Sequence, residues 1–422
     1  MAHPPIDAAP AGPAGPAPPR IRLGMVGGGE GAFIGALHRI AARLDDHYEL
    51  VAGALASDAD SALRSGRALR LAEDRIYADY ATMARCEARR ADGIEVVAIV
   101  TPNPLHAPVA RAFLKAGIHV ICDKPLATTG RDARRLQALA LKHDRIVAVT
   151  YPYIGYPMVR QARQMVAEGR LGEVRSVQVE YAQDWLTEPL EASGHKQAVW
   201  RNDPARAGAG GCIGDIGTHA FRLAEFVTGD RVSELCAELT RFVADRRLDD
   251  NAQLLLRFAG GARGALWASQ VAPGNDNNLR LRVHGAKGGI DWRQEQPNQL
   301  RWSPLGEPTQ ILARGTPAVG PAAARVSRLP ADHPEGYLEA FATLYGEIAA
   351  AIRSARAGPG EEASKLDPAV QFPTVADGVR GVDFIEAAVA SSARGARWVR
   401  LAPQRPPLPP LKHSPPAPPL KP

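Results

Sequence analysis

Lys124 is the first of three side chains whose chemistry suits proton transfer and charge stabilisation. It follows the run His119-Val120-Ile121-Cys122 and precedes Pro125, which predicts a position at the carboxyl end of a parallel strand. Ligands bind at that edge of open α/β sheets. An ammonium held there could hydrogen-bond an alcohol oxygen and stabilise charge as it develops. The alternative is a surface lysine with a packed stem and a solvated head.

Asp215 and His219 stand four residues apart at the start of a predicted helix that ends at Gly229. This spacing predicts that both lie on one helix face, about one turn from each other. Histidine can accept a proton near neutral pH, and a neighbouring carboxylate would orient the ring or stabilise its charged form. The alternative is a helix-capping aspartate and a core histidine.

A glycine-rich run from Leu23 to Gly35 lies between a predicted strand and a predicted helix. Gly27, Gly29 and Ala32 satisfy G-x-G-x-x-A, a pattern that brings bare backbone and a helix N-terminus against a pyrophosphate. We therefore predict a dinucleotide site rather than a simple glycine-rich turn. The predicted contact set in this run is Gly27, Gly29, Gly31, Ala32, Phe33 and Ile34.

The second predicted strand leaves through Ala54-Leu55-Ala56-Ser57-Asp58. An acid here would bind the adenosine ribose of NAD, whereas a small residue with nearby arginines would accept the 2′-phosphate of NADP. Asp58 favours NAD. Ser57 with Arg64 or Arg67 leaves NADP open, and Asp58 could instead cap the following helix.

Two domains are needed to position these groups. Residues 21–26, 49–54, 96–100, 120–122 and 146–149 alternate with helical patterns, which predicts a doubly wound parallel Rossmann sheet. Beyond Thr150 the alternation of Val177, Val179 and Tyr181, and a Gly260-Gly261 turn, indicate an α+β domain with a large, mostly antiparallel open sheet. We expect its last long helices over residues 336–354 and 374–393.

Length and composition set the limits of the interpretation. The 422 residues predict a dinucleotide domain over 21–150, a substrate and oligomerisation domain over 151–402, and flexible Pro/Ala-rich tails over 1–20 and 403–422. The net charge of +6 is dispersed, so we expect no nucleic-acid partner. The four cysteines show no metal spacing, and no apolar run reaches membrane length, so we expect no metal, no membrane contact and a cytoplasmic protein.

The chain resembles the Gfo/Idh/MocA oxidoreductases in four segments: VGGGEGAFIG, VTPNPLH (residues 100–106), CDKPLA (residues 122–127) and GGCIGDIGTHAFRLAEFVTG (residues 210–229). The resemblance implies that Lys124, Asp215 and His219 are catalytic. It also implies cofactor contacts, near the nicotinamide and at the lysine motif, from Thr101, Pro102, Asn103, His106, Asp123, Lys124 and Pro125. Asp123 departs from the usual glutamate, which keeps the charge on a shorter arm.

The same resemblance, which is strongest to sugar and cyclic polyol dehydrogenases, implies a substrate lining of Tyr153, Gln183, Trp200 and Tyr337. Trp185, Trp267 and Trp302 are expected in the core. We expect oxidation of a secondary alcohol of a sugar or cyclic polyol with NAD, in a homo-oligomer (dimer or tetramer). A redox-neutral NAD-dependent glycosidase and a non-catalytic dinucleotide sensor are the alternatives.

Overall fold

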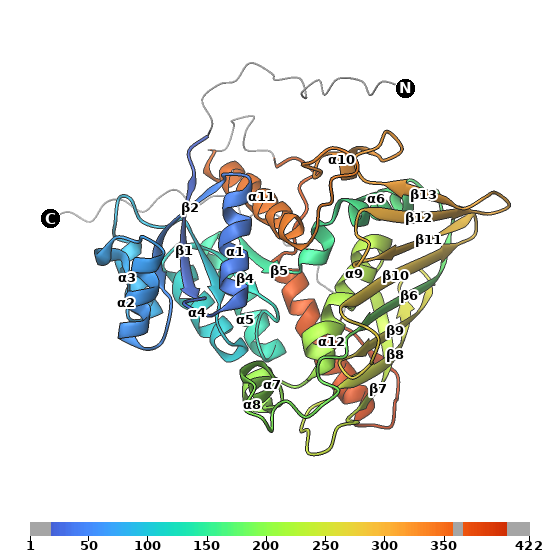
Figure 1. Ribbon diagram of the computed structural model, residues 1–422, viewed down its shortest axis with the longest axis horizontal. Helices are drawn as coiled ribbons and strands as arrows, with labels where there is room; N and C mark the ends of the chain where they lie inside the picture. The colour runs from blue at the N-terminus through green and yellow to red at the C-terminus, as the bar shows by residue number, and fades with distance from the viewer. Residues whose placement is uncertain (1–17, 358–365, 403–422) are drawn as a thin grey trace.

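The computed structural model describes residues 18–357 and 366–402 and contains two β-sheets with helices packed between and around them (Figure 1). The predicted tails, residues 1–20 and 403–422, lie outside the described residues except for residues 18–20. None of the helices in the described ranges has the length and apolar character that crossing a bilayer requires.

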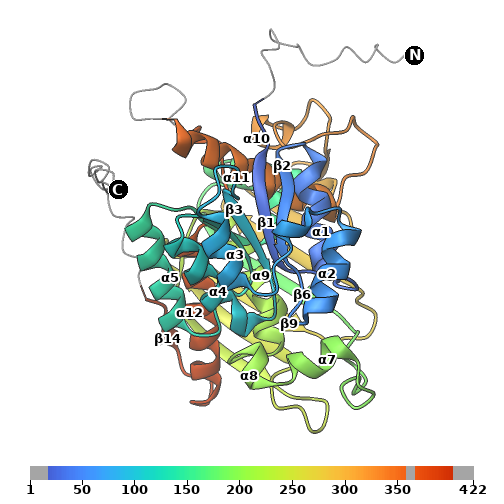
Figure 2. The same cartoon turned by 90° about the vertical axis from the view of Figure 1, so that its left-hand side faces the viewer.

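The first sheet is parallel, with strand order β2-β1-β3-β4-β5. This order confirms the predicted Rossmann fold, and buried strands such as Val96–Val100 explain the continuous apolar runs in the sequence. The strands are β1 (Ile21–Gly27), β2 (Tyr48–Ala54), β3 (Val96–Val100), β4 (His119–Asp123) and β5 (Val147–Thr150). Its helices are α1 (Phe33–Leu44), α2 (Ala59–Ala68), η1 (Glu73–Arg75), α3 (Tyr80–Glu87), α4 (Asn103–Lys115) and α5 (Gly130–His143). Figure 2 shows them around this sheet.

The second sheet has nine strands in the order β13-β12-β11-β10-β6-β9-β8-β7-β14. Only the β6–β9 pair within it is parallel, as the sequence predicted for a mostly antiparallel sheet. The strands are β6 (Val174–Ala182), β7 (Val232–Thr240), β8 (Asn251–Phe258), β9 (Arg263–Ser269), β10 (Asn278–Gly285), β11 (Gly288–Arg293), β12 (Gln299–Pro304), β13 (Gln310–Ala313) and β14 (Val399–Arg400).

One face of this sheet is covered by helices that lie between the two sheets in Figure 1. Alternate residues of each strand point to these helices and are buried, as in β10. The remaining helices are η2 (Pro152–Gly155), α6 (Pro157–Ala167), α7 (Lys196–Arg201), α8 (Pro204–Ala207), the π-helix η3 (Ile213–Gly217), α9 (Thr218–Thr228), α10 (Pro321–Ala324), α11 (Tyr337–Arg356) and α12 (Val375–Ser392).

The last two long helices form where the sequence predicted them, and α11 packs in two cores. Its residues Phe341, Tyr345 and Ile348 belong to the core of the first sheet, together with α1. Helix α12 contacts both α5 and β7. Ala340 and Leu344 of α11 belong to the core of the second sheet. Helix α11 therefore contributes to both cores, and its assignment to the second domain stays a prediction. The C-terminal helices thereby join the two sheets.

Candidate active site

A cavity of about 1570 Å³ runs along the carboxyl ends of the parallel strands to the second sheet. The glycine loop lines one end of it. Lys124, Asp215 and His219 line the other. Lys124, which is distant in the sequence from Asp215 and His219, therefore faces the same space as they do, beside the predicted dinucleotide site.

The N-terminus of α1 is available to an anion. Its N-cap, Ala32, makes no side-chain cap, and its first turn carries no acidic residue. By contrast α2, α3 and α5 are capped by the side chains of Asp58, Asp79 and Thr129. Free N–H groups and the positive end of the helix dipole favour a bound phosphate here, so the residues fit the pyrophosphate of a dinucleotide.

Gly29 and Gly31 in this loop need to be glycine for different structural reasons. A Cβ on Gly29 would lie 2.8 Å from the Leu55 carbonyl oxygen and from Ser65 Oγ. Glycine is therefore required at position 29 by packing against the residue after β2 and against α2, as well as by any ligand. Gly31 has φ +76 and open space around it, so glycine is favoured there by backbone conformation. Phe33 and Ile34 also line the cavity.

The predicted cofactor contacts divide into cavity lining and supporting residues. Thr101, Pro102, Asp123 and Ser57 line the cavity, and the buried Thr101 Oγ1 has no hydrogen-bond partner within the described ranges. Asp58 is exposed and accepts a hydrogen bond from Ser61 N at 2.8 Å. The cap that the sequence left open is therefore present.

His106 and Asn103 support the wall from behind. His106 is 1% exposed, and its ring nitrogens lie 2.7 Å from the Pro125 carbonyl oxygen and 2.8 Å from that of Thr101. Asn103 donates to the Ala207 carbonyl at 3.0 Å. These contacts differ from the expected place beside the nicotinamide, because both side chains are occupied in joining strand-end loops to each other and to α8.

Asp215 is at the centre of a charged cluster. Lys124 Nζ donates to its Oδ1 at 2.8 Å and to its backbone carbonyl at 2.6 Å. Arg201 Nε and Gln270 Nε2 donate to Oδ2 at 2.8 and 3.0 Å. Burial raises the pKa of the carboxyl, but the charges of Arg201 and Lys124 outweigh it and hold the pKa well below its usual range. Asp215 is thus ionised at neutral pH.

His219 is 8% exposed and stands edge-on to the rings of Tyr151 and Tyr153, at centroid distances of 5.4 and 5.0 Å. Its Nδ1 is buried without a hydrogen-bond partner among the residues described. Burial lowers the pKa of His219 well below its usual value, and the Lys124 charge lowers it further. The ring is therefore neutral, in the state required to accept a proton.

The Asp215 carboxylate makes no hydrogen bond to His219 among the described residues, so the expected orientation of the ring by this carboxylate is not seen. The carboxylate accepts from Lys124, Arg201 and Gln270 instead. Asp215 lies in the π-helix η3, and the regular α-helix begins at Thr218. Both carboxylate oxygens of Asp215 are taken by these three donors, so neither is engaged by His219. Asp215 still acts on His219 through its charge.

A chain of hydrogen-bonded polar side chains forms a wall of the same cavity. Tyr153 and Tyr181 share a hydroxyl–hydroxyl hydrogen bond, and Tyr181 donates to Asn277 Oδ1 at 2.8 Å. Gln183 Nε2 donates to the same oxygen at 2.8 Å and accepts from Trp185 Nε1 at 3.1 Å. Burial raises the pKa of Tyr153 to about 12, so its hydroxyl remains a donor.

The substrate-side predictions are partly altered. Tyr153, Gln183 and Tyr337 line the cavity. Trp200 instead packs on Arg201, whose guanidinium carbon lies 4.3 Å from its ring centroid. Trp185, expected in the core, lines the cavity, because the segment after β6 turns back over it.

Of the other two tryptophans expected in the core, Trp302 lies there and Trp267 does not. Trp302 is 5% exposed and belongs to the core, as predicted. Trp267 is only half-buried on β9, with its Nε1 donating to Asn251 Oδ1 at 3.0 Å.

Sequence reasoning missed Arg201, Gln270 and Asn277. They come from α7, the residue after β9 and the loop before β10, and no shared motif connects them. The one available signal was local: Arg201 follows Trp200, which was already a candidate.

Comparison with known proteins agrees with this geometry. The oxidoreductase family with an NAD-binding Rossmann fold matches residues 21–151, and the GFO/IDH/MocA C-terminal domain matches residues 159–291. The fold and the pyrophosphate cradle thus define an NAD-binding oxidoreductase.

The solved relatives extend over nearly the whole chain. An oxidoreductase from Sinorhizobium meliloti is 52% identical with TM-score 0.81, covering 90% of this chain and 100% of that one. An inositol dehydrogenase homolog from Azotobacter vinelandii, complexed with NADH and myo-inositol, is 39% identical with TM-score 0.84, covering 90% and 97%. The levoglucosan dehydrogenase of Pseudarthrobacter phenanthrenivorans is 28% identical over 67% of this chain and 75% of its own.

The chain belongs to the Gfo/Idh/MocA oxidoreductase family. It is an oxidoreductase with an NAD-binding Rossmann domain, as the sequence predicted.

Proposed function

We propose that the protein oxidises a secondary alcohol of a sugar or cyclic polyol. The observation that supports this most is that Lys124 Nζ and the neutral His219 line the same cavity as the wall of Tyr153, Gln183 and Asn277. Phenols and amides pair with ring hydroxyls, and aromatic faces cover apolar ring surfaces. The relatives that act on or bind levoglucosan and myo-inositol support the same class of substrate.

Each residue has a distinct role in this proposal. His219 accepts the hydroxyl proton of the substrate. Lys124 donates a hydrogen bond to the same oxygen and stabilises its developing charge. Asp215 fixes Lys124, and Arg201 and Gln270 fix Asp215. When bound, the nicotinamide ring of NAD accepts the hydride that leaves the carbinol carbon. Thr101, with its unpaired Oγ1, and Asp123 hold the nicotinamide half of the cofactor.

We also propose a preference for NAD over NADP. Asp58 follows Ser57, which lines the cavity, and its exposed carboxylate is ionised, since hydrogen bonds from Ser61 lower its pKa. A carboxylate repels a 2′-phosphate and accepts from a 2′-hydroxyl.

The test is a screen of cyclic polyols and sugars against both cofactors, followed by NADH absorbance. Stoichiometric NADH accumulation is expected. Release of a sugar from a glycoside without accumulation would identify the redox-neutral glycosidase instead. NAD binding without turnover of any substrate in the screen would favour the sensor. With an active substrate, His219→Ala should lose about 10²- to 10⁴-fold in kcat/KM while still binding NAD.

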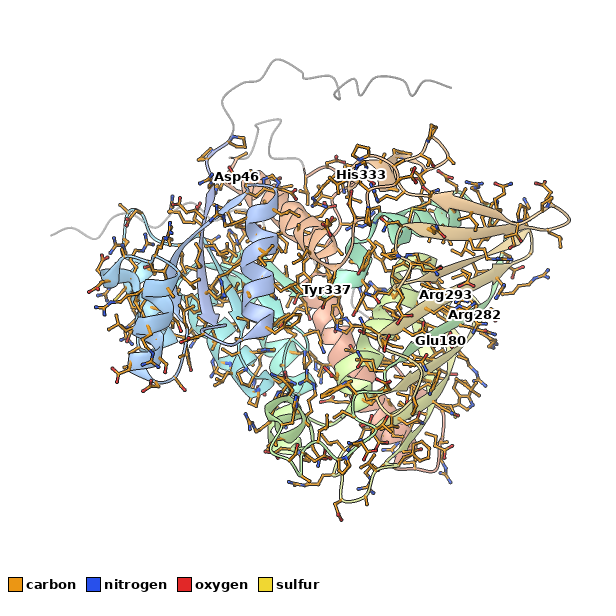
Figure 3. All side chains as sticks on the ribbon, in the orientation of Figure 1. Asp46, Glu180, Arg282, Arg293, His333 and Tyr337 are labelled. Atoms are coloured by element: carbon orange, nitrogen blue, oxygen red, sulfur yellow. The ribbon has the colours of Figure 1, made fainter. Side chains whose placement is uncertain are left out.

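We also propose that the protein forms a homo-oligomer and is located in the cytoplasm. The outer face of the large sheet presents charged side chains such as Glu180, Arg282 and Arg293 (Figure 3), together with the 55% exposed Leu255 on β8. This face could pair with a second copy, and light scattering of the full chain tests it. All four cysteines are free, which fits a reducing compartment.

A further inference from the structure

His38, on α1, is a completely buried histidine that the proposed chemistry leaves without a role. Its relative exposure is 0%, and its ring meets Phe341 edge-on at a centroid distance of 5.1 Å. Nδ1 lies 2.9 Å from the hydroxyl of Tyr345. Nε2 has no hydrogen-bond partner among the described residues and lies 3.7 Å from Asp123 Oδ1. One nitrogen is thus held by α11, while the other faces the end of β4.

The surroundings select the tautomer of His38. A Tyr345 hydroxyl that donates to Nδ1 leaves the ring proton on Nε2. That N–H then points toward the Asp123 carboxylate. The order of contacts is Tyr345 hydroxyl, His38 ring, Asp123 carboxylate, with Thr150 Oγ1 donating to the same Oδ1 at 2.5 Å.

Asp123 connects His38 to the cavity, because it faces His38 and also lines the cavity. It precedes Lys124 and lines the cavity with a side chain that is 18% exposed. Burial raises the pKa of its carboxyl, but His38 and Thr150 outweigh burial and bring the pKa to about 2. The aspartate that replaces the family's glutamate therefore remains ionised.

The location of Asp123 identifies its ligand. The pyrophosphate cradle at the start of α1 occupies one end of the cavity, and Lys124 and His219 occupy the other. Hydride transfer requires the nicotinamide at the second end, next to Asp123. The oxidised nicotinamide is positively charged and the reduced one is neutral, so a nearby carboxylate favours the oxidised form.

We propose that His38 is a positioning residue for Asp123, and that through Asp123 it sets the preference of the site for NAD⁺ over NADH. The inference rests on the proposed placement of the nicotinamide beside Lys124. It differs from the proposed function in acting on cofactor binding, with no need for substrate. It also connects α1, which binds the pyrophosphate, to the strand end that carries the catalytic lysine.

The pH dependence follows from the groups around Asp123. In the wild type its carboxylate persists far below neutral pH. Without His38, the effect of burial is less opposed and the pKa of Asp123 rises. The contribution of the carboxylate to NAD⁺ affinity is then present above this new pKa and is lost as the pH falls through it. The other titratable groups near Asp123, by element, are Cys122 and Lys124 (β4 and its end), His106 (α4), His219 (α9), and Tyr337 and Tyr345 (α11). All are retained in a His38 variant.

The experiment measures the dissociation constants of NAD⁺ and NADH by calorimetry on the full chain, from about pH 8 to about pH 5. His38→Phe keeps the packing on Phe341 but has no N–H. Its preference for NAD⁺ over NADH, measured as the ratio of the two dissociation constants, should fall about five- to tenfold as the pH falls. In the wild type this ratio should not change with pH. His38→Gln, whose amide can donate toward Asp123, should restore the flat profile. The matched control is His119→Phe, since His119 lies at the opposite end of β4 and accepts from Ile146 N.

If His38→Phe binds NAD⁺ and NADH more weakly by the same factor at every pH, His38 has a merely structural role and the inference is overturned. If His38→Phe does not fold, Asp123→Asn provides the test. That variant should show a reduced NAD⁺ preference at every pH, and adding His38→Gln to it should change nothing further. An Asp123→Asn variant with the wild-type preference also overturns the inference. Failure of the wild type to bind NAD⁺ would instead refute the proposed cofactor site.

Discussion

Lys124 donates two hydrogen bonds to Asp215, at 2.6 Å to the backbone carbonyl and at 2.8 Å to Oδ1. The backbone contact is the more informative one, because it ties the ammonium to the π-helix rather than to a side chain that could rotate. Lys124 is therefore placed before a substrate arrives, and its third N–H is left for the substrate oxygen. Such placement lowers the reorganisation needed during catalysis.

Arg201→Met should weaken catalysis more than cofactor binding. The guanidinium holds Asp215 Oδ2 and packs on Trp200, so its loss leaves a buried carboxylate with one fewer charged donor. Such a hydrogen bond contributes about 1.5 to 3 kcal/mol, and we expect about a tenfold or larger fall in kcat/KM with NAD affinity unchanged. Arg201→Lys should recover part of the loss. Arg206→Met, at an exposed site on α8, is the control, and an equal effect there would refute the assignment.

Ala32→Asp should separate helix stability from cofactor binding. Aspartate at an N-cap stabilises a helix by about 0.5 to 2 kcal/mol relative to alanine, so the melting temperature should stay the same or rise. The new carboxylate would occupy the free N–H groups and repel the pyrophosphate, so NAD affinity should fall about tenfold or more. Calorimetry and thermal unfolding measure both quantities. Arg131→Glu, in the exposed first turn of α5, controls for added negative charge.

Local sequence signals predicted the elements better than the contacts between them. Short apolar runs alternating with helical patterns located the five parallel strands, and the apolar run before Lys124 placed it at a strand end. The hydrogen-bond partners of the Asp215 carboxylate were not predictable, because Lys124, Arg201 and Gln270 come from other segments of the chain. Trp185, expected in the core, lines the cavity, and Trp200, expected in the cavity, packs on Arg201, for a similar reason. Their environment is set by how the segment after β6 folds over the site, which involves residues distant in the sequence.

Asp58→Ser should test the ribose contact without removing the cap of α2. Asp58 both caps this helix, through Ser61 N, and provides the acid that we propose reads the adenosine ribose. Serine caps helices well but is neutral, so stability should be retained while the preference for NAD over NADP narrows. The ratio of kcat/KM for the two cofactors, with the melting temperature as control, measures this. A preserved ratio in Asp58→Ser would assign the discrimination to other residues, such as Ser57.

The pH profile should identify His219 as the base. Its usual pKa of 6.5 is lowered by burial and then by the Lys124 charge, so the neutral, proton-accepting form persists below that pH. We expect wild-type kcat/KM to stay level from about pH 8.5 to about pH 6, without a fall near 6.5. Lys124→Met removes the charge that opposes protonation, so the His219 pKa should rise.

The residual activity of that variant should therefore begin to fall at a higher pH than in the wild type. Lys124→Arg keeps the charge and should keep the low inflection, although its rate will be lower because the guanidinium is larger. An inflection at the same pH in the wild type and both variants would show that the titrating group is not His219. The catalytic proton transfer would then have to be assigned to another group in the cavity.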